Sequence, residues 1–560
     1  MLCCLIAGGL IFNPVRNQPI LNKVFDSKKP QLSRSIELNC AFSLSRHAIN
    51  RPNQIALVVD GDSYSYAELA SLAGKVAAWL QAAEPEKMLG ARVGVLTSRT
   101  LDTYAGILGA CWSGASYVPI NAKLPAARLA NVLARGKLGA LIVDETGVKC
   151  LEQLEPDLIP QRILGPITCG RKKGGNGGVM LQGLNPVPEP VAVSADHCAY
   201  VMFTSGTTGL PKGVMVSTGN LSCFLDCTRR LYRLGPEDRV SQFSEVSFDF
   251  SVLDLFFAWD AGAALYTVPD SQLMAPARFI QENKLTFWAS VPSVITFLDR
   301  FKLLRPGAFP SLRASYFCGE PLALASAQAW QRAAPNSLVD NHYGPTEATV
   351  ACSFDRLSAE PNVTPERGIV AIGKPYSGMR MAVVDEAGAF LPAWKTGELA
   401  LSGSQVALGY FGEPELTARR FRELKHPQWG LATWYLTGDL AREDHSGCFH
   451  HLGRVDHQVK VLGHRIELEE VDSHLRNACG CDAAVAVAWP VRQGIAEGLV
   501  AFVGGGTLDS SHILENLKQR VPPYMVPQRI IRMESLPLTP NGKIDRRRLA
   551  ESLEQDGTGL

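Results

Sequence analysis

Short apolar runs alternate with helical patterns along most of the chain. Residues 55–60 (IALVVD) and 92–97 (RVGVLT) are β-branched runs bounded by polar or glycine residues, which is typical of buried strands. Between them, SYAELASLAGKVAAWLQAA has apolar residues at helical spacing. Ser65 stands three residues before Glu68, the spacing of a capping box. The alternation recurs further along the chain and predicts an α/β fold with largely parallel sheets.

The pattern changes near Asp456. Before it, YLTGDLAREDHSGCFHHLGRVD predicts β-hairpins joined by turns. After it, HQVKVLGHRIELEEVDSHLRNA predicts a strand followed by an amphipathic helix. We expect an N-terminal extension (1–40), a large multi-layer core domain (41–455) and a small α+β C-terminal domain (456–560) that presents Lys543 at the tip of a turn.

Composition narrows the possible partners. The formal net charge is +1, so neither nucleic acid nor an anionic membrane surface is expected as a partner. The 14 cysteines show no metal-binding spacing, which favours reduced thiols in a cytoplasmic enzyme over a disulfide scaffold. The apolar start, MLCCLIAGGLIFNP, is too short to span a bilayer and lacks the positive region of a signal peptide.

Residues 203–214, FTSGTTGLPKGV, crowd hydroxyl residues, glycines and one lysine together. Glycine lets backbone N–H groups approach an anion closely, and Lys212 adds positive charge. The stretch is not a Walker A loop, because Gly213 rather than Ser or Thr follows the lysine. It predicts a phosphate-binding loop fed by a strand, with a flexible linker as the alternative.

The stretch closely resembles the phosphate-binding loop of the adenylate-forming enzymes, the superfamily of acyl-CoA synthetases, luciferases and nonribosomal-peptide adenylation domains. Further segments resemble motifs of this superfamily in the same order, over roughly residues 40–555. They are GASYVPIN (114–121), FDFSVLDLF (248–256), NHYGPTEAT (341–349), GELALSGSQVALGYFGEPELTARRF (397–421), YLTGDLARED (435–444), LGRVDHQVKVLGHRIELEEV (452–471) and LPLTPNGKIDRRRL.

The resemblance implies that a carboxylate attacks the α-phosphorus of ATP, giving an acyl-adenylate and pyrophosphate. Two anions must then be screened from each other, so catalysis is mainly electrostatic. The implied catalytic residues are Lys543, which would bridge the carboxylate and the α-phosphate from a mobile C-terminal domain, Thr346 and Lys212. An exposed turn lysine is the alternative for Lys543.

The resemblance also implies a nucleotide site. Glu347 would hold Mg²⁺, Tyr343 would stack on adenine, and Asp439 would accept hydrogen bonds from the ribose hydroxyls. Core packing is the alternative for Tyr343, and an N-cap or turn residue for Asp439. The residues expected to contact ATP are Thr204, Ser205, Gly206, Thr207, Thr208, Gly209, Lys212, Gly319, Glu320, Pro321, Asn341, His342, Tyr343, Gly344, Pro345, Thr346, Asp439, Arg454 and Lys543.

Asp249 bears on the substrate. It matches the aspartate that pairs with the α-ammonium group in peptide-synthetase adenylation domains, and a buried carboxylate needs such a partner charge. The alternative is a helix-capping role, which would leave the substrate class open. The expected side-chain pocket is small and admits residues such as alanine, serine or proline. Its residues are Phe250, Leu253, Ser290, Tyr316, Cys318, His342, Val350 and Ala351.

The sequence leaves three points about the site open. His342 and Ser290 could meet a polar substrate side chain, but His342 could equally be a hydrogen-bonded core residue. Lys460 resembles a residue that faces the site in a second, thioester-forming conformation, with a solvated strand lysine as the alternative. Leu462 departs from the usual arginine, which makes docking of the small domain less certain.

Three hypotheses follow. The first is an ATP-dependent ligase that passes an amino acid to the phosphopantetheine thiol of a separate carrier protein, since the chain has no carrier-serine or condensation motif. The second keeps the fold but activates another carboxylic acid and uses coenzyme A as acceptor; a basic groove would favour it. The third is a binding protein without turnover, which intact Lys212, Glu347, Asp439 and Lys543 argue against.

Overall fold

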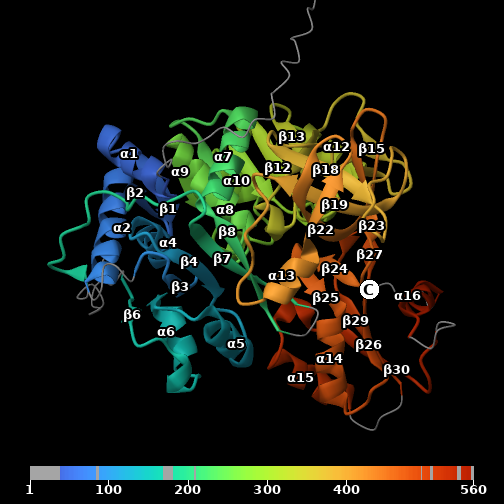
Figure 1. Ribbon diagram of the computed structural model, residues 1–560. Helices are drawn as coiled ribbons and strands as arrows, with labels where there is room; N and C mark the ends of the chain where they lie inside the picture. Colours follow the sequence, from blue (N-terminus) through green and yellow to red (C-terminus); the bar gives the residue numbers. More distant parts are fainter. Residues whose placement is uncertain are drawn as a thin grey trace, which may run out of the picture. The chain divides into compact units, whose positions relative to one another are not determined.

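The computed structural model describes most of the chain (Figure 1). The described residues are 38–82, 88–167, 181–206, 210–492, 495–504, 509–538 and 544–555. Residues 37–560 form one compact unit. Of the expected extension, 1–40, residues 1–37 lie outside the description. Asn39 donates side-chain hydrogen bonds to the carbonyls of Cys111 (2.7 Å) and Val191 (2.8 Å).

A nine-stranded sheet has a parallel centre and antiparallel edges. Its order is β17-β14-β13-β12-β11-β9-β10-β1-β2, and the strands from β13 to β1 run parallel. The strands are β1 (Ile55–Val59), β2 (Asp62–Ser65), β9 (Arg239–Gln242), β10 (Ala264–Thr267), β11 (Phe287–Ser290), β12 (Ala314–Phe317), β13 (Leu338–Tyr343), β14 (Ser353–Arg356) and β17 (Lys374–Pro375).

A seven-stranded sheet follows the same plan, in the order β20-β8-β7-β4-β3-β5-β6, with parallel pairing from β7 to β6. The prediction of an α/β fold with largely parallel sheets is therefore confirmed. The strands are β3 (Arg92–Thr97), β4 (Ser116–Asn121), β5 (Ala140–Val143), β6 (Ile163–Leu164), β7 (Cys198–Thr204), β8 (Lys212–Ser217) and β20 (Gly409–Tyr410).

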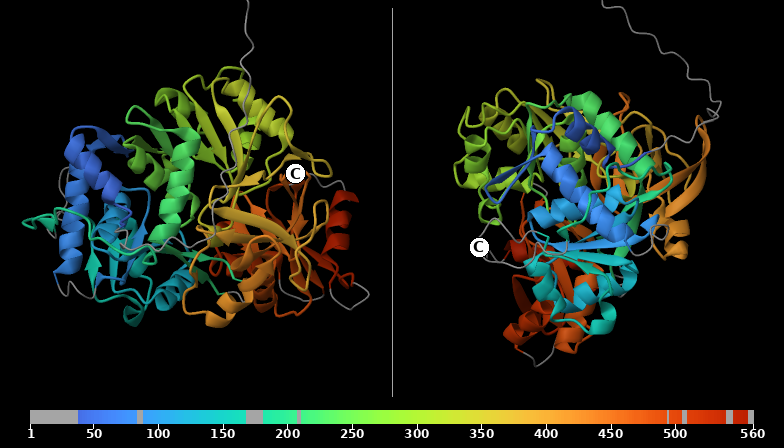
Figure 2. Two further views of the ribbon diagram at one scale, coloured as in Figure 1. Left: turned by 45° about the horizontal axis from the view of Figure 1, so that its top comes forward. Right: turned by 90° about the vertical axis from the view of Figure 1, so that its left-hand side faces the viewer.

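Helices connect the parallel strands and flank the sheets (Figure 2). The predicted capping box is confirmed, because Ser65 and Glu68 exchange side-chain and backbone hydrogen bonds at the start of α2. Every residue of α4 is buried, as expected of a helix that is apolar all round. The helices are α1 (Phe42–Asn50), α2 (Tyr66–Gln81), α4 (Leu101–Trp112), α5 (Ala126–Gly136), α6 (Glu145–Leu151), α7 (Thr218–Tyr232), α10 (Ala277–Glu282), α11 (Ser293–Arg300) and α12 (Leu324–Ala333), with short 3-10 turns at Pro156–Leu158 and Asp270–Gln272.

A third sheet is antiparallel and contains the predicted hairpins. Its long strand β22 pairs with β19, β21 and β23. The elements are β18 (Met379–Val384), β19 (Gly397–Gly403), α13 (Pro414–Arg420), β21 (Phe421–His426), β22 (Gly430–Glu443) and β23 (Phe449–Arg454), and a separate pair is formed by β15 (Val363–Thr364) and β16 (Ile369–Val370).

The elements after Asp456 have an apolar core of their own, built on Val461, Ile466, Leu475, Leu499 and Met525 among others. The domain boundary at Asp456 stays a prediction. The predicted single strand was wrong, because Leu462 (φ 49°) and Gly463 (φ 83°) turn the chain into a hairpin. The elements are β24 (Gln458–Val461), β25 (His464–Glu467), α14 (Leu468–Cys479), β26 (Ala484–Ala488), β27 (Val491–Arg492), β28 (Ile495–Ala496), β29 (Leu499–Gly504), α15 (Ser510–Lys518), a 3-10 turn (Pro523–Met525), β30 (Arg529–Met533) and α16 (Arg546–Gln555).

Among the described residues, no helix has the length and apolar character that crossing a membrane requires.

The separate core predicts local instability when it is damaged. Leu475 is fully buried in it, so Leu475→Ala should lower the free energy of unfolding of residues 456–560 by about 2–5 kcal/mol. Hydrogen exchange should rise in α14 and β26 but not in the nine-stranded sheet. Leu431→Ala, at a side chain that is 66% exposed, is the control. Equal loss of protection in the nine-stranded sheet would show that the boundary is wrong.

Candidate active site

Three neighbouring parallel strands bring the expected residues together. β11 and β13 end at Ser290 and Tyr343, and between them β12 ends directly before Cys318. The carboxyl ends of parallel strands meet at one edge of a sheet, where open α/β folds hold their ligands. Gly319, Glu320 and Pro321 continue from the end of β12.

Asn341 offers a free acceptor at this edge. Its Nδ2 donates to the carbonyls of Val370 (3.1 Å) and Ala371 (2.8 Å). Its Oδ1 is buried, and no hydrogen-bond partner for it exists in the described structure. A buried acceptor without a partner costs free energy, so it fits a ligand that donates there, such as the exocyclic amine of adenine.

Asp439 is held as a charged carboxylate. It lies on β22 opposite Arg454 of β23, and Nη1 of Arg454 donates to Oδ1 at 2.6 Å. Tyr343 donates to Oδ2. Burial opposes the charge, but the hydrogen bonds and charges of His451, Arg454 and Tyr343 outweigh it and hold the pKa of Asp439 well below its usual range. The N-cap alternative is wrong, because Asp439 lies inside a strand.

Two residues of this cluster were missed by the sequence prediction. Nε2 of His451 lies 3.4 Å from Oδ1 of Asp439, and Nη1 of Arg367 lies 2.7 Å from Nδ1 of the same imidazole. Arginine only donates, so Nδ1 accepts and Nε2 carries the proton that faces Asp439. In the sequence, His451 could have been identified only by its position three residues before Arg454. No feature of the sequence indicated Arg367.

The phosphate loop carries a buried cation, Lys212, which pairs with Thr204 across strands β7 and β8. Burial lowers the pKa of Lys212 to about 8, although Glu347 opposes the shift from 3.3 Å. Oγ1 of Thr204 is buried with no partner in the described ranges, and Ser205 donates to the carbonyl of Arg465 at 2.8 Å. Gly206 follows Ser205, whereas Thr207, Thr208 and Gly209 lie outside the described residues.

Glu347 is fully buried and receives three contacts. After β13, Gly344 and Pro345 lead into the 3-10 turn Thr346–Ala348, which places this carboxylate beside the loop lysine. Tyr410 donates to Oε1 at 2.7 Å, and Arg465 pairs with Oε2 at 3.1 Å. Burial alone would raise the pKa of Glu347, but Arg465 and Lys212 together hold it well below its usual range. The sequence prediction missed Arg465 and Tyr410.

Asp249 lies beside Thr346 and is not a helix cap. It precedes α8 (Phe250–Val252), the π-helical turn Leu253–Phe257 and α9 (Ala258–Ala261), yet its side chain makes no capping hydrogen bond. Burial raises the pKa of Asp249 to about 6, while a hydrogen bond from Thr346 and the charge of Lys460 oppose the shift. The capping alternative is therefore wrong.

The expected side-chain pocket is lined by buried residues. Tyr316 stacks on His342 with ring centroids 3.6 Å apart, and Phe250 meets Tyr316 edge-on at 5.7 Å. Ser290 accepts from Trp288 at 2.9 Å. The remaining members, Leu253, Cys318, Val350 and Ala351, are also buried.

His342 is a hydrogen-bonded core residue in this structure. Its Nε2 lies 2.6 Å from the hydroxyl of Tyr232, and its Nδ1 lies 2.6 Å from the hydroxyl of Tyr376. Tyr232 donates to Asp340, so it accepts from Nε2 of the imidazole, and Tyr376 donates to Nδ1. Both ring nitrogens are thus engaged, which favours the core alternative over contact with a polar substrate group.

The β24–β25 hairpin lies against the site. The amide of Gly463 donates to Oε1 of Glu320, and Lys460 acts electrostatically on Asp249, Cys318 and Glu320. This placement fits the site-facing alternative for Lys460. Lys543 lies outside the described residues, so its position is not part of this geometry.

Comparison with known proteins shows what the chain is similar to. The family model described as "AMP-binding enzyme" matches residues 44–411. One of the proteins of linear gramicidin synthase from Brevibacillus parabrevis is 33% identical over 510 residues, which is 89% of this chain and 6% of the relative. Phenyloxazoline synthase MbtB of Mycobacterium tuberculosis is 33% identical over 519 residues, 91% of this chain and 35% of the relative. The chain therefore spans a small part of these relatives.

Solved structures agree with this fold. The Vibrio cholerae adenylation domain AlmE, solved with glycyl-adenosine-5′-phosphate, is 30% identical with a TM-score of 0.79, covering 97% of this chain and 100% of that chain. IdnL7 is 32% identical with a TM-score of 0.66, covering 93% and 99%. PA1221, at 24% identity and a TM-score of 0.75, shows the same fold over 92% of this chain and 85% of that chain.

The proton on Nε2 of His451 predicts a role in nucleotide affinity. His451→Phe removes the donor that faces Asp439, so the KM for ATP should rise about 3–10-fold, the size of one hydrogen bond, with kcat little changed. His451→Gln should recover part of the loss, because its amide can donate. His512→Phe, at an exposed histidine on α15, is the control. An unchanged KM for ATP in His451→Phe would contradict the role.

Proposed function

Because this chain belongs to the AMP-binding enzyme family of ATP-dependent adenylate-forming ligases, we propose that it activates a small α-amino acid as aminoacyl-AMP. We further propose that it passes the aminoacyl group to the phosphopantetheine thiol of a separate carrier protein. The observation that carries the first part is Asp249, a carboxylate that accepts a hydrogen bond from Thr346 and acts electrostatically on Cys318, one of the buried residues expected to line the side-chain pocket.

Asp249 supports a zwitterionic substrate on electrostatic grounds. Burial makes the anionic form of this carboxylate less stable, so a cation beside it would stabilise it. The α-ammonium group of an amino acid supplies that cation, whereas a fatty or aryl acid does not. The peptide synthetases among the relatives and the glycyl-adenylate in AlmE support the same substrate class.

The closely packed rings of Phe250, Tyr316 and His342 support a small substrate side chain. Tyr316 and His342 are each no more than 2% exposed, and the hydrogen bonds of His342 hold its ring in place. A larger substrate side chain would have to displace rings that pack at interior density. Glycine, alanine and serine are therefore the first acids to test.

The charges around Glu347 support electrostatic catalysis. In the proposed reaction Lys212 stabilises phosphate oxygens, Thr346 donates to the α-phosphate, and Lys543 bridges the reacting carboxylate and the α-phosphate. We also propose that Mg²⁺ neutralises phosphate charge. A carboxylate such as that of Glu347 is a suitable ligand for it. In this structure Oε2 of Glu347 pairs with Arg465, which belongs to the segment after Asp456. Glu347 would therefore hold Mg²⁺ once that segment has moved away.

The β24–β25 hairpin supports the thioester half of the proposal. Gly463 donates to Glu320 and Lys460 acts on Asp249, and these contacts support the proposal that this arrangement corresponds to the thioester-forming conformation. The acceptor thiol would then enter after adenylation, when Lys543 is no longer needed at the site. A second conformation of the same domain would bring Lys543 in.

A second candidate acceptor is coenzyme A, because a cavity of about 230 Å³ lies between α5 and α14. Arg128, His474 and Arg520 line it, and Pro211 of the phosphate loop forms part of its wall. A phosphate adjoins the pantetheine arm of either acceptor, and coenzyme A adds a nucleotide. Thioester formation with free coenzyme A but not with a phosphopantetheinylated carrier would favour this second candidate.

Pyrophosphate exchange across the amino acids tests the adenylation step. One small amino acid should drive label from pyrophosphate into ATP, while fatty and aryl acids should not. Lys543→Ala should reduce exchange by orders of magnitude with ATP binding retained, because the lysine acts mainly in the transition state. Lys518→Ala, on α15, is the matched control. Exchange with no acid, in folded protein that binds ATP, would overturn the proposal.

The amine-pairing role of Asp249 predicts a pH dependence. Its pKa is raised to about 6, so kcat/KM for the amino acid should fall as the pH drops through about 6 and the carboxylate becomes neutral. Asp249→Asn should abolish this step and lower kcat/KM about 10²–10³-fold, as expected when a buried charge loses its partner. Asp226→Asn, in an exposed ion pair, is the control.

The comparison substrate for that experiment is the des-amino analogue of the same acid. The wild type should prefer the amino acid strongly, and Asp249→Asn should lose the preference. A variant that still prefers the amino acid over its analogue would show that Asp249 does not pair with the amine.

A further inference from the structure

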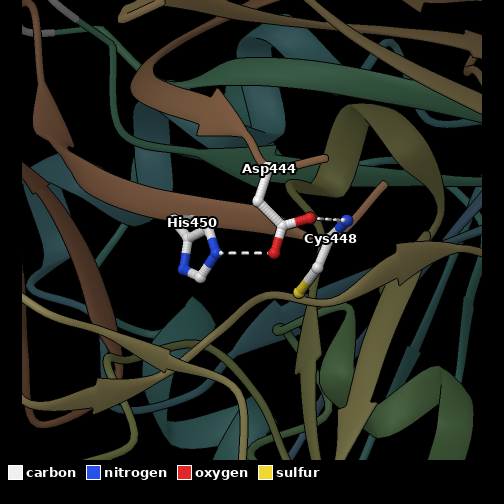
Figure 3. Close-up of side chains that lie close together, drawn as sticks. All are labelled: Asp444, Cys448 and His450. Carbon is white, nitrogen blue, oxygen red and sulfur yellow. Dashed lines mark hydrogen bonds and ion pairs between the residues drawn. The ribbon is translucent and has the colours of Figure 1, made fainter. Parts of the chain in front are cut away.

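The β22–β23 hairpin carries a second cluster of chemically active side chains, at the end away from Asp439. Asp444, Cys448 and His450 each offer one donor atom, and these atoms all lie within 4.8 Å of one another (Figure 3). Cys448 is fully buried and His450 is 4% exposed. None of the three has a part in the proposed adenylation chemistry.

The hairpin geometry explains how the three donors converge. Arg442 and Glu443 of β22 pair with His450 and Phe449 of β23, and the chain turns between Asp444 and Cys448. Successive strand residues point to opposite faces, so Cys448 and His450 share one face. The amide of Asp444 donates to the carbonyl of Cys448 at 2.9 Å, which places Asp444 directly across the turn.

The hydrogen bonds around the cluster engage one oxygen of Asp444 and leave the other close to the imidazole of His450. Oδ1 of Asp444 accepts from the amides of Ser446 (2.8 Å) and Cys448 (2.9 Å), so this oxygen is engaged. The other oxygen, Oδ2, lies 3.5 Å from Nε2 of His450, which is long for a hydrogen bond (Figure 3). Nδ1 of His450 lies 3.2 Å from the hydroxyl of Thr364, the kind of outer partner that orients a ligating imidazole.

The surroundings are rich in negative charge. Asp355 acts electrostatically on both Cys448 and His450, and its Oδ2 is buried without a hydrogen-bond partner in the described part of the chain. Its Oδ1 accepts from Asn362 at 3.0 Å. Lys374 also acts electrostatically on Asp355 and Cys448, with the opposite sign. A buried thiol facing two carboxylates is a place where a divalent cation would offset unfavourable charge.

We propose that this cluster is a zinc site, with Sγ of Cys448, Nε2 of His450 and Oδ2 of Asp444 as ligands. A thiolate, an imidazole and a carboxylate suit the borderline-soft Zn²⁺, whereas Mg²⁺ and Ca²⁺ take oxygen ligands. Binding forms the Zn–S bond and releases the thiol proton of Cys448 to solvent. The fourth position is taken by water or by Asp355.

The zinc site would influence the nucleotide site through the backbone of strand β23, which carries a residue of each site. His450 precedes His451, whose Nε2 faces Asp439. A metal that fixes His450 would therefore fix the backbone that presents His451. The expected role of the metal is to rigidify this hairpin; it takes no part in the reaction, so the inference does not rest on the proposed function.

Metal content tests the proposal directly. The full chain, dialysed against metal-free buffer after exposure to Zn²⁺ alone, should retain about one zinc per chain by plasma mass spectrometry. Cys448→Ser and His450→Gln should each lose it, and Cys150→Ser, at a partly buried thiol on α6, should keep it. Asp355→Asn identifies the fourth ligand. This substitution should weaken zinc affinity if Asp355 is that ligand, and should leave zinc affinity unchanged if the ligand is water.

Cobalt provides a readout that does not depend on activity. Co²⁺ added to the zinc-free chain should give a thiolate-to-metal charge-transfer band, which Cys448→Ser should abolish and Cys150→Ser should not. Thermal melting establishes whether each variant is folded. If Cys448→Ser does not fold, the metal content of His450→Gln and Asp444→Asn tests the zinc site instead. Zinc that is absent from the wild type, or equal in the wild type and folded Cys448→Ser or His450→Gln, would overturn the proposal.

Discussion

The buried carboxylate of Glu347 is the interaction on which the site depends. It draws together the phosphate loop through Lys212, strand β20 through Tyr410 and the β24–β25 hairpin through Arg465. A fully buried anion must be compensated, so these segments cannot separate without cost.

The same constraint links chemistry to conformation. Arg465 belongs to the segment after Asp456, and it compensates Glu347 only while the β24–β25 hairpin lies against the site. Any motion of that segment exposes Oε2 of Glu347 and requires another cation in its place. In the proposed cycle, magnesium with ATP would meet that requirement in one conformation and Arg465 in the other, so charge balance would favour two discrete states.

The β22–β23 hairpin shows how one element can serve two purposes. Its inner end pairs Asp439 with Arg454, and its outer end closes on Asp444 and Cys448. His450 and His451 are neighbours in sequence but belong to different clusters, because adjacent strand residues point to opposite faces. Antiparallel pairing transmits the position of one end to the other, which makes the hairpin a direct physical link between the two sites.

Ordered motifs in the sequence determined the fold class and the chemical identity of most of the site. Lys212 was predicted from the chemistry of its glycine- and hydroxyl-rich loop, whereas Glu347 and Asp439 were predicted because their motifs resemble those of the adenylate-forming enzymes. The tertiary structure decided which groups compensate them. The sequence separation from the partner is 118 residues for Arg465, 84 for Arg367, 63 for Tyr410 and 12 for His451, and the assembly of the sheets brings each pair close. Likewise, the hydrogen bonds of His342 and the convergence of Asp444, Cys448 and His450 depend on strand register, which no linear spacing specifies.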